Sequence, residues 1–259
     1  PAEVTHIKNM SKKKQNRYSN FFLKIKNFYS KSKIFNYILT NFPPFNDFIF
    51  ERLKSKIRKF YVEKFICENQ EKIFSQNKNK KFITFFLQSE PELIIYKLGG
   101  RYFSDQKQII KHLALSLPSN FILLVKEHIS QGINSRYRNL QFFNDIKSFS
   151  NVRIIKSHED PINLIEKSFA IANLSGSIGL EAIVRNKPLI LFGSVFYQNY
   201  RGVFKINKFE DLDNIIQKIE DKIDYFNDEN ECLRFAYAIR KSMFKGNIFD
   251  GSYLTKNNT

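Results

Sequence analysis

The chain has 259 residues, 42% of them hydrophobic, which is enough for one large or two small domains and excludes wholesale disorder. Its formal net charge is +17, from 42 Lys and Arg against 25 Asp and Glu. Residues 1–80 hold 18 basic and 6 acidic residues, so most of the excess is N-terminal. Such an excess suits an anionic surface, for example membrane lipid, nucleic acid or a polyanionic glycan.

The two cysteines, Cys67 and Cys232, form neither the spacing of a zinc site nor a disulfide framework, so a reducing compartment is the simpler interpretation. No apolar run approaches the roughly 20 residues that span a bilayer. The N-terminus also lacks the apolar stretch of a signal peptide. We therefore expect a cytoplasmic protein.

The first 80 residues are expected to precede the main domain. Residues 1–20 are polar and predict a mobile basic tail, and residues 21–80 predict a basic helical linker segment. Within it, residues 21–40 and above all 45–66 carry apolar side chains at helical spacing with Lys and Arg between them, the pattern of a basic amphipathic helix. Two interpretations stay open: a helix packed on the domain with a solvated basic face, or one that contacts a membrane surface or another anionic partner.

From residue 82 onward, short apolar segments alternate with helical patterns. The expected strands are 82–87, 121–126, 152–155, 169–174 and 188–193, and the expected helices are 104–116, 136–148, 160–168, 177–185, 210–223 and 229–245. This alternation predicts an α/β domain over residues 81–250, built as a Rossmann-like parallel sheet with helices on both faces, and a tail at 251–259. Ligands of such sheets bind at the carboxyl ends of the strands, so the residues just after each strand are the first candidates for a site.

Ser175-Gly176-Ser177 stands between an expected strand and the helix after it. Glycine permits a sharp turn and close approach of the backbone. The two hydroxyls and the free N–H groups at the helix start can bind a phosphate. Glu181, about one helical turn further, can accept hydrogen bonds from ribose hydroxyls. The alternative is that the serines only cap the helix.

Two other loops carry titratable side chains. Lys126 ends an expected strand, and His128 follows it, where an imidazole can donate to a phosphate oxygen or transfer a proton. A structural histidine is the alternative. Glu90 and Glu92 flank Pro91 after another strand, and either glutamate can act as a general base, bind sugar hydroxyls or belong to a solvated acidic loop.

The order of these pieces closely resembles the capsular polysaccharide biosynthesis proteins, bacterial surface-glycan glycosyltransferases of which some transfer Kdo from CMP-Kdo. The resemblance spans about residues 80–250. It rests on Gln88, Pro91 and Glu92, Asp105-Gln106, Lys126-Glu127-His128, Ser175-Gly176-Ser177 with Gly179 and Glu181, Lys187-Pro188, Gly193 and Phe196-Tyr197. It implies the C-terminal, nucleotide-sugar-binding half of a GT-B glycosyltransferase.

The resemblance also implies roles for single residues. The implied donor-binding residues are Lys126, Ser175, Gly176, Ser177 and Glu181, with Glu181 on the nucleoside. The implied catalytic residues are His128, on the donor phosphate, and Glu90 and Glu92, which would face the cleft.

Two features depart from the family pattern. Ile129 follows His128 where the family usually has proline. Residues 1–80 show no N-terminal Rossmann half, and the chain begins with Pro1, so a fragment, a split-gene product and a degenerate enzyme all remain open.

The leading hypothesis is a glycosyltransferase of capsular or related surface-glycan synthesis. It would use a nucleotide-sugar donor, with CMP-Kdo as one candidate, a lipid-linked or glycan acceptor, and no cofactor or essential metal, at the inner face of the cytoplasmic membrane. The second hypothesis is a non-catalytic or incomplete nucleotide-binding half that acts as a partner in polysaccharide synthesis or export. A nucleic-acid-binding protein is disfavoured, because the basic excess falls in the expected linker and the aromatic residues follow core periodicity.

Overall fold

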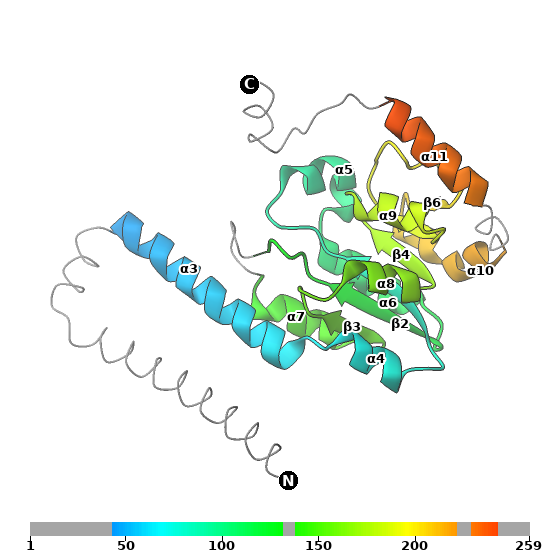
Figure 1. Ribbon diagram of the computed structural model, residues 1–259. Helices are drawn as coiled ribbons and strands as arrows, with labels where there is room; N and C mark the ends of the chain where they lie inside the picture. Colours follow the sequence, from blue (N-terminus) through cyan, green and yellow to red (C-terminus); the bar gives the residue numbers. More distant parts are fainter. Residues whose placement is uncertain (1–42, 132–137, 222–228, 243–259) are drawn as a thin grey trace, which may run out of the picture. The chain divides into compact units, whose positions relative to one another are not determined.

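The computed structural model describes residues 43–131, 138–221 and 229–242 (Figure 1). The chain divides into two compact units, residues 1–54 and 55–259. Of the first unit, only the beginning of helix α3 (Pro43–Tyr61) is described. The tail predicted at 1–20, the helix predicted at 21–40 and the tail predicted at 251–259 lie outside the described residues.

The second unit is built on one sheet of parallel strands in the order β3-β2-β1-β4-β5-β6. The strands are β1 (Lys81–Phe86), β2 (Phe121–Lys126), β3 (Val152–Ile155), β4 (Ala170–Asn173), β5 (Leu189–Leu191) and β6 (Val203–Lys205). The predicted Rossmann-like sheet is therefore confirmed. Strand order reverses between β1 and β4, the position at which ligands bind in open parallel sheets.

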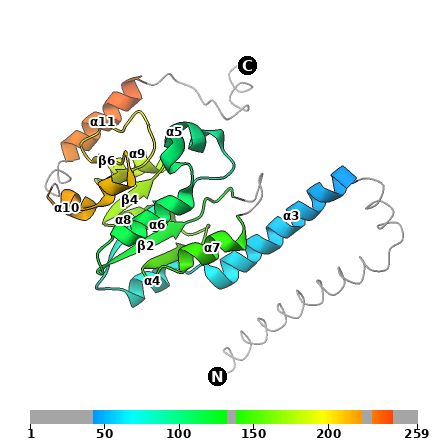
Figure 2. The same cartoon turned by 180° about the vertical axis from the view of Figure 1, so that it is seen from behind.

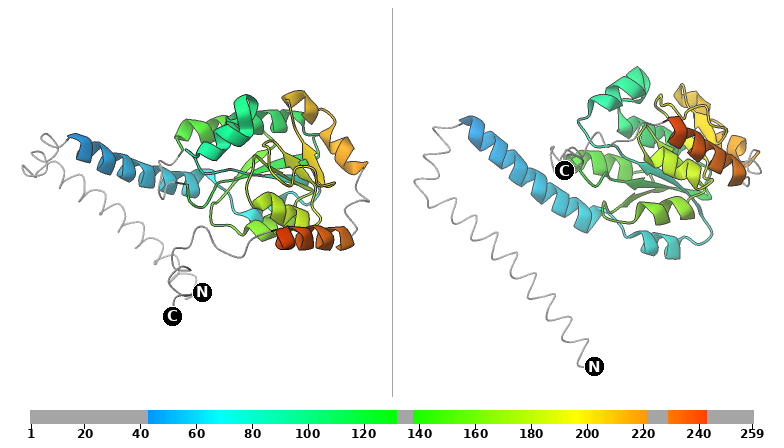
Figure 3. Two further views of the ribbon diagram at one scale, coloured as in Figure 1. Left: turned by 90° about the horizontal axis from the view of Figure 1, so that it is seen from above. Right: turned by 45° about the horizontal axis from the view of Figure 1, so that its top comes forward.

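Helices cover both faces of the sheet, as predicted (Figures 2 and 3). One face packs against α5 (Leu93–Phe103), α6 (Gln106–Ser116), α7 (Leu140–Lys147) and α10 (Ile215–Glu220). The other packs against α4 (Gln70–Gln76), α8 (Pro161–Lys167), α9 (Ile178–Val184) and α11 (Glu229–Ser242). Side chains of a strand alternate between the faces, so Ile83 and Phe85 of β1 enter the first core while Phe82 and Phe86 enter the second. Both faces are buried, which explains why the strands read as continuous apolar runs.

Residues 55–80 belong to the domain, whereas the sequence suggested a linker up to residue 80. Helix α3 runs into a π-helical turn (Val62–Ile66), whose Val62 and Ile66 are buried in the core. Glu68 then pairs with Ile155 beside β3. The polar run at 75–81, which resembles a linker, instead contains the end of α4 and the start of β1.

The other differences concern short or interrupted elements. Strand β6 has three half-buried residues and no apolar run, so the sequence does not reveal it. Helix α5 was also not predicted, and its pattern is broken by Gly99 and Gly100. The helix expected at 210–223 is a short 3-10 helix (Phe209–Leu212) followed by α10. None of the helices in the described ranges is long and apolar enough to cross a membrane.

Candidate functional site

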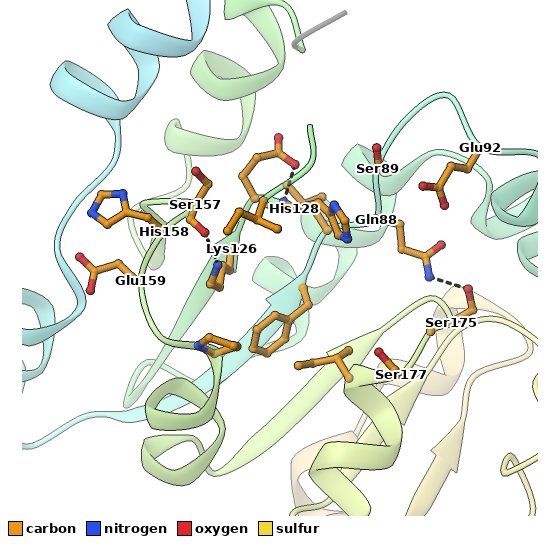
Figure 4. Close-up of a pocket in the computed structure, with 17 residues that line it drawn as sticks. Gln88, Ser89, Glu92, Lys126, His128, Ser157, His158, Glu159, Ser175 and Ser177 are labelled. Atoms are coloured by element: carbon orange, nitrogen blue, oxygen red, sulfur yellow. Dashed lines mark hydrogen bonds between the residues drawn. The ribbon is translucent and has the colours of Figure 1, made fainter. Parts of the chain in front are cut away.

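A pocket of about 400 Å³ opens at the carboxyl ends of β1, β2, β3 and β4 (Figure 4). Six of the eight predicted site residues line it: Glu92, Lys126, His128, Ser175, Gly176 and Ser177. The other two, Glu90 and Glu181, are not among its lining residues. The loops after four strands thus meet at the edge of the sheet where the sequence placed the site.

The Ser175–Ser177 loop has a left-handed turn at its centre. Gly176 has φ of +99°, a backbone conformation that side-chain-bearing residues rarely adopt. The loop is held from two sides: Gln88 Nε2 donates to Ser175 Oγ at 2.5 Å, and Tyr197 Oη donates to the Gly176 carbonyl at 2.6 Å. The alternative role of the serines finds no support in the described contacts, because Ser177 at the start of α9 makes no side-chain cap bond. Its hydroxyl is exposed at the pocket.

Tyr197 reaches this loop only because residue 179 is a glycine. A Cβ atom at Gly179 would lie 2.5 Å from Tyr197 Oη and 2.9 Å from two ring carbons. Both residues are among those that carry the family resemblance, but the sequence analysis assigned them no function. In the structure the pair packs α9 against the buried tyrosine and so supports the turn at Gly176.

Lys126 ends β2 inside the domain, and only 6% of the residue is exposed. Its ammonium donates to the Ser157 carbonyl at 2.7 Å. Burial lowers the pKa of this lysine, and the nearby carboxylates of Glu63 and Glu127 oppose that shift. The residue therefore brings a buried cation to the pocket wall.

His128 stands between the two groups of polar side chains that Figure 4 shows, those after β3 and those after β1 and β4. Its Nδ1 accepts a hydrogen bond from the Ser130 N–H at 3.2 Å, so the neutral ring carries its proton on Nε2. Burial lowers its pKa from the ordinary 6.5, with Glu92 opposing and Lys126 and Arg138 reinforcing the shift. At pH 7 the ring is a neutral donor.

Arg138 is a buried residue that the sequence did not single out. Its Nε donates to Glu127 Oε2 at 2.8 Å, and its Nη2 donates to the Gln88 carbonyl. Its Nη1 lies 2.5 Å from Glu90 Oε2, so the two groups form an ion pair, although their geometry is not that of a hydrogen bond. Glu90 also accepts from Gln106 Nε2 at 2.5 Å, which turns its carboxylate toward these partners and away from the pocket lining.

Glu127 is the carboxylate that pairs with Arg138, and it is 1% exposed. Burial raises its pKa, against the charge and hydrogen bond of Arg138. Glu181 lies in the first turn of α9 and is half-buried. Its contact with a nucleoside stays a prediction.

The part of the pocket after β3 is built with help from the segment before the sheet. Glu63 accepts from the Ser157 N–H at 3.1 Å, and Glu159 accepts from Asn69 Nδ2 at 2.8 Å. The sequence marked the residues after the third strand for inspection but gave no reason to include Glu63 and Asn69. In the part of the chain that the structure describes, no three His, Cys, Asp or Glu side chains gather as metal ligands would.

A family model described as capsule polysaccharide biosynthesis protein matches residues 2–214. No curated protein matches the chain. Among solved structures, a beta Kdo 2,7 transferase, KpsC of Thermosulfurimonas dismutans, is 17% identical over 61% of this chain and 47% of that chain, with a TM-score of 0.41. The beta Kdo 2,4 transferase of the same KpsC is 15% identical over 62% of this chain and 50% of that chain, with a TM-score of 0.42. The UDP-GlcNAc 2-epimerase of Neisseria meningitidis bound to UDP-GlcNAc is 20% identical over 62% and 41%, with a TM-score of 0.40.

At these identities the likeness to solved structures concerns the fold alone. The chain spans about half the length of the solved structures that it matches.

Proposed function

Because the chain belongs to the capsule polysaccharide biosynthesis protein family, we propose that it is a glycosyltransferase that binds a nucleotide-sugar donor in the pocket. The observation that carries this proposal is the meeting of the family-motif loops after β1, β2 and β4 around one pocket at the reversal of strand order. CMP-Kdo is one candidate donor, and UDP- and GDP-sugars are the others. The acceptor is a glycan or a glycolipid.

The side chains of the pocket suit a donor held by its phosphate. Glycosyl transfer leaves negative charge on the nucleotide, and donors that are already in place stabilise that charge without reorganisation. Lys126 supplies a buried cation, His128 a neutral N–H donor and Ser177 a hydroxyl. Glu92, exposed at the pocket, is our candidate for the base that takes the proton of the acceptor hydroxyl.

The first test is calorimetric titration of the purified chain with CMP, UDP and GDP. We expect binding of one of the three, weakened in both Ser177→Ala and His128→Ala. Ser75→Ala is the matched control, because Ser75 is an exposed serine of α4 that bonds only its own helix. Binding that is the same in all four proteins would contradict the assignment of the pocket.

A second candidate function is a nucleotide-binding half that does not catalyse transfer by itself. The residues that the structure describes hold a single parallel sheet, and this alternative rests on that observation. A transfer assay with the donor whose nucleotide binds, and with a glycolipid acceptor, separates the two. Turnover by the isolated chain, lost in Glu92→Gln, supports the enzyme, and binding without turnover supports the partner protein.

We further propose that the protein works at the inner face of the cytoplasmic membrane, near a lipid-linked acceptor. Tyr61 and Phe65 expose their rings at 46% and 57%, and the Lys64 ammonium lies 5.1 Å from the Phe65 ring centre. Aromatic rings flanked by lysines suit the interface of an anionic bilayer. Sedimentation with vesicles should show binding to phosphatidylserine-containing lipid and little to pure phosphatidylcholine, with less binding in Tyr61→Ser/Phe65→Ser.

A further inference from the structure

The guanidinium of Arg138 contacts three residues of two loops, those after β1 and β2. Nε reaches the carboxylate of Glu127 beyond β2, Nη2 reaches the carbonyl of Gln88 beyond β1, and Nη1 lies beside the carboxylate of Glu90. Arg138 is 6% exposed and Glu127 is 1% exposed, so their ion pair lies out of water, whereas the Glu90 side chain is 35% exposed. Each of the three nitrogens serves a different group.

Each of the two hydrogen-bonded partners, Glu127 and Gln88, makes a second hydrogen bond to a residue that lines the pocket. Glu127 uses its second oxygen to accept the His128 N–H at 2.7 Å. Gln88 uses its side-chain amide to donate to Ser175 Oγ. One guanidinium therefore connects, through one intermediate each, the His128 loop after β2 and the Ser175 loop after β4.

We propose that Arg138 is the positioning residue of this pocket, which clamps the loops after β1 and β2 so that His128 and Ser175 hold a fixed separation. The proposal rests on the proposed function, since it concerns the geometry in which a nucleotide would be bound. Arg138 itself does not line the pocket and touches no substrate. In this proposal Glu90 belongs to the clamp and is not the general base, and the base assignment falls to Glu92 alone.

Lysine cannot replace arginine in this role. A guanidinium is planar and presents donors in several fixed directions, whereas an ammonium is a point charge on a flexible stem. Lysine at this position would keep the charge but satisfy the three acceptors incompletely. The clamp therefore predicts that the charge-conserving variant fails, while a role limited to neutralising Glu127 predicts that it succeeds.

Gln106 provides a natural comparison. Its side chain also holds the loop after β1, through Gln88 N–H at 2.8 Å and Glu90 Oε1, but no described contact joins it to Glu127. Loss of Gln106 should loosen the loop after β1 and leave His128 unchanged. Loss of Arg138 should affect both loops.

The test uses the full chain as wild type, Arg138→Gln, Arg138→Lys, Gln106→Leu and the double variant Arg138→Met/Glu127→Gln. The double variant removes both buried charges together and should fold where a single loss leaves one of them unpaired. Without nucleotide, hydrogen exchange of residues 86–90 and 127–130 reports the two loops, and NMR titration of the His128 ring reports its surroundings. The charged groups that act on that ring are Glu92, Lys126 and Arg138, and Glu127 binds the backbone N–H of the same residue.

We expect faster exchange of both loops in Arg138→Gln, Arg138→Lys and the double variant, and of the first loop alone in Gln106→Leu. The His128 pKa should rise in Arg138→Gln, because a nearby cation is lost. Affinity for the nucleotide that binds the wild type should fall roughly 10-fold in the folded double variant, in the range of coupled neighbouring residues. Wild-type exchange and affinity in Arg138→Lys, or in the double variant, would overturn the proposal.

The readouts also separate this inference from the function on which it rests. If no nucleotide binds the wild type, the proposed function fails, while the exchange and titration data still decide whether Arg138 clamps the two loops. If nucleotide binds and the loops exchange equally in all variants, the function stands and the clamp is wrong.

Discussion

The contact between Gly179 and Tyr197 gives a prediction whose size follows from the structure. In Gly179→Ala the new methyl group would stand 2.5 Å from Tyr197 Oη, far inside van der Waals contact. Tyr197 is buried, so its ring has to be displaced. The displacement also strains the bond from Tyr197 Oη to the Gly176 carbonyl, which is 2.6 Å long in the native protein.

Three terms decide the change in the free energy of unfolding. Overpacking a buried site costs about 1–3 kcal/mol, and a lost hydrogen bond about 1 kcal/mol. Replacing a helical glycine with alanine returns about 1 kcal/mol. The sum is a loss of about 1–3 kcal/mol. For a domain of this size that corresponds to a fall in Tm of very roughly 2–12 °C.

Urea unfolding followed by circular dichroism measures this change. Gly99→Ala is the matched control, because a methyl group there would first meet the side chain of Leu174 at 3.0 Å rather than a phenol oxygen at 2.5 Å. Tyr197→Phe removes the hydroxyl, so Gly179→Ala should cost less in that background than in the wild type. A Gly179→Ala protein as stable as the wild type would refute the view that this glycine is required for close packing.

Three further predictions follow from local contacts. Asp160 accepts from the backbone N–H groups of Ile162 and Asn163 at the start of α8, so Asp160→Ala should lower the free energy of unfolding by about 1 kcal/mol in urea titration, and Asp160→Asn by much less. Cys67 and Cys232 are both buried, and burial raises the pKa of the Cys67 thiol, so a thiol reagent at pH 8 should label the protein only in denaturant, and rapid labelling of the native protein would contradict the packing. The pKa of His128 is lowered in the folded protein, so the unfolded chain binds this proton more readily. The contribution of the residue to stability is therefore complete above the ordinary pKa of 6.5 and declines as the pH falls below it. His128→Gln should reduce that decline at acid pH, and an unchanged pH profile would argue against a lowered pKa of the ring.

The sequence was sufficient to predict the alternating strands and helices of the fold. Long apolar runs such as 121–126 are buried on both faces, and that double burial is the signal a sequence carries most plainly. Strand β6 carries no such signal, because its three residues are only half-buried and pairing with β5 alone defines it as a strand.

The sequence predicted those residues of the candidate site that come shortly after the end of a strand. Ser175, His128 and Glu92 each follow or lie near the end of a strand, and parallel strands bring such positions to one edge. Arg138 was missed because its importance comes from partners 11, 48 and 50 residues away in sequence, and no local pattern encodes them. For the same reason Glu90 read as a catalytic candidate although its carboxylate is engaged by Arg138 and Gln106.

The pairing of Glu68 with Ile155 bears on how this protein can be shortened. The strand pattern suggests a truncation at residue 81, yet Glu68 covers part of the outer edge of β3, and Glu63 and Asn69 fix the pocket residues that follow it. A chain cut at residue 81 would present the free backbone groups of an edge strand, which invite pairing with another molecule. Such a fragment should therefore self-associate, and a failure to bind ligand in it would say nothing about the intact pocket.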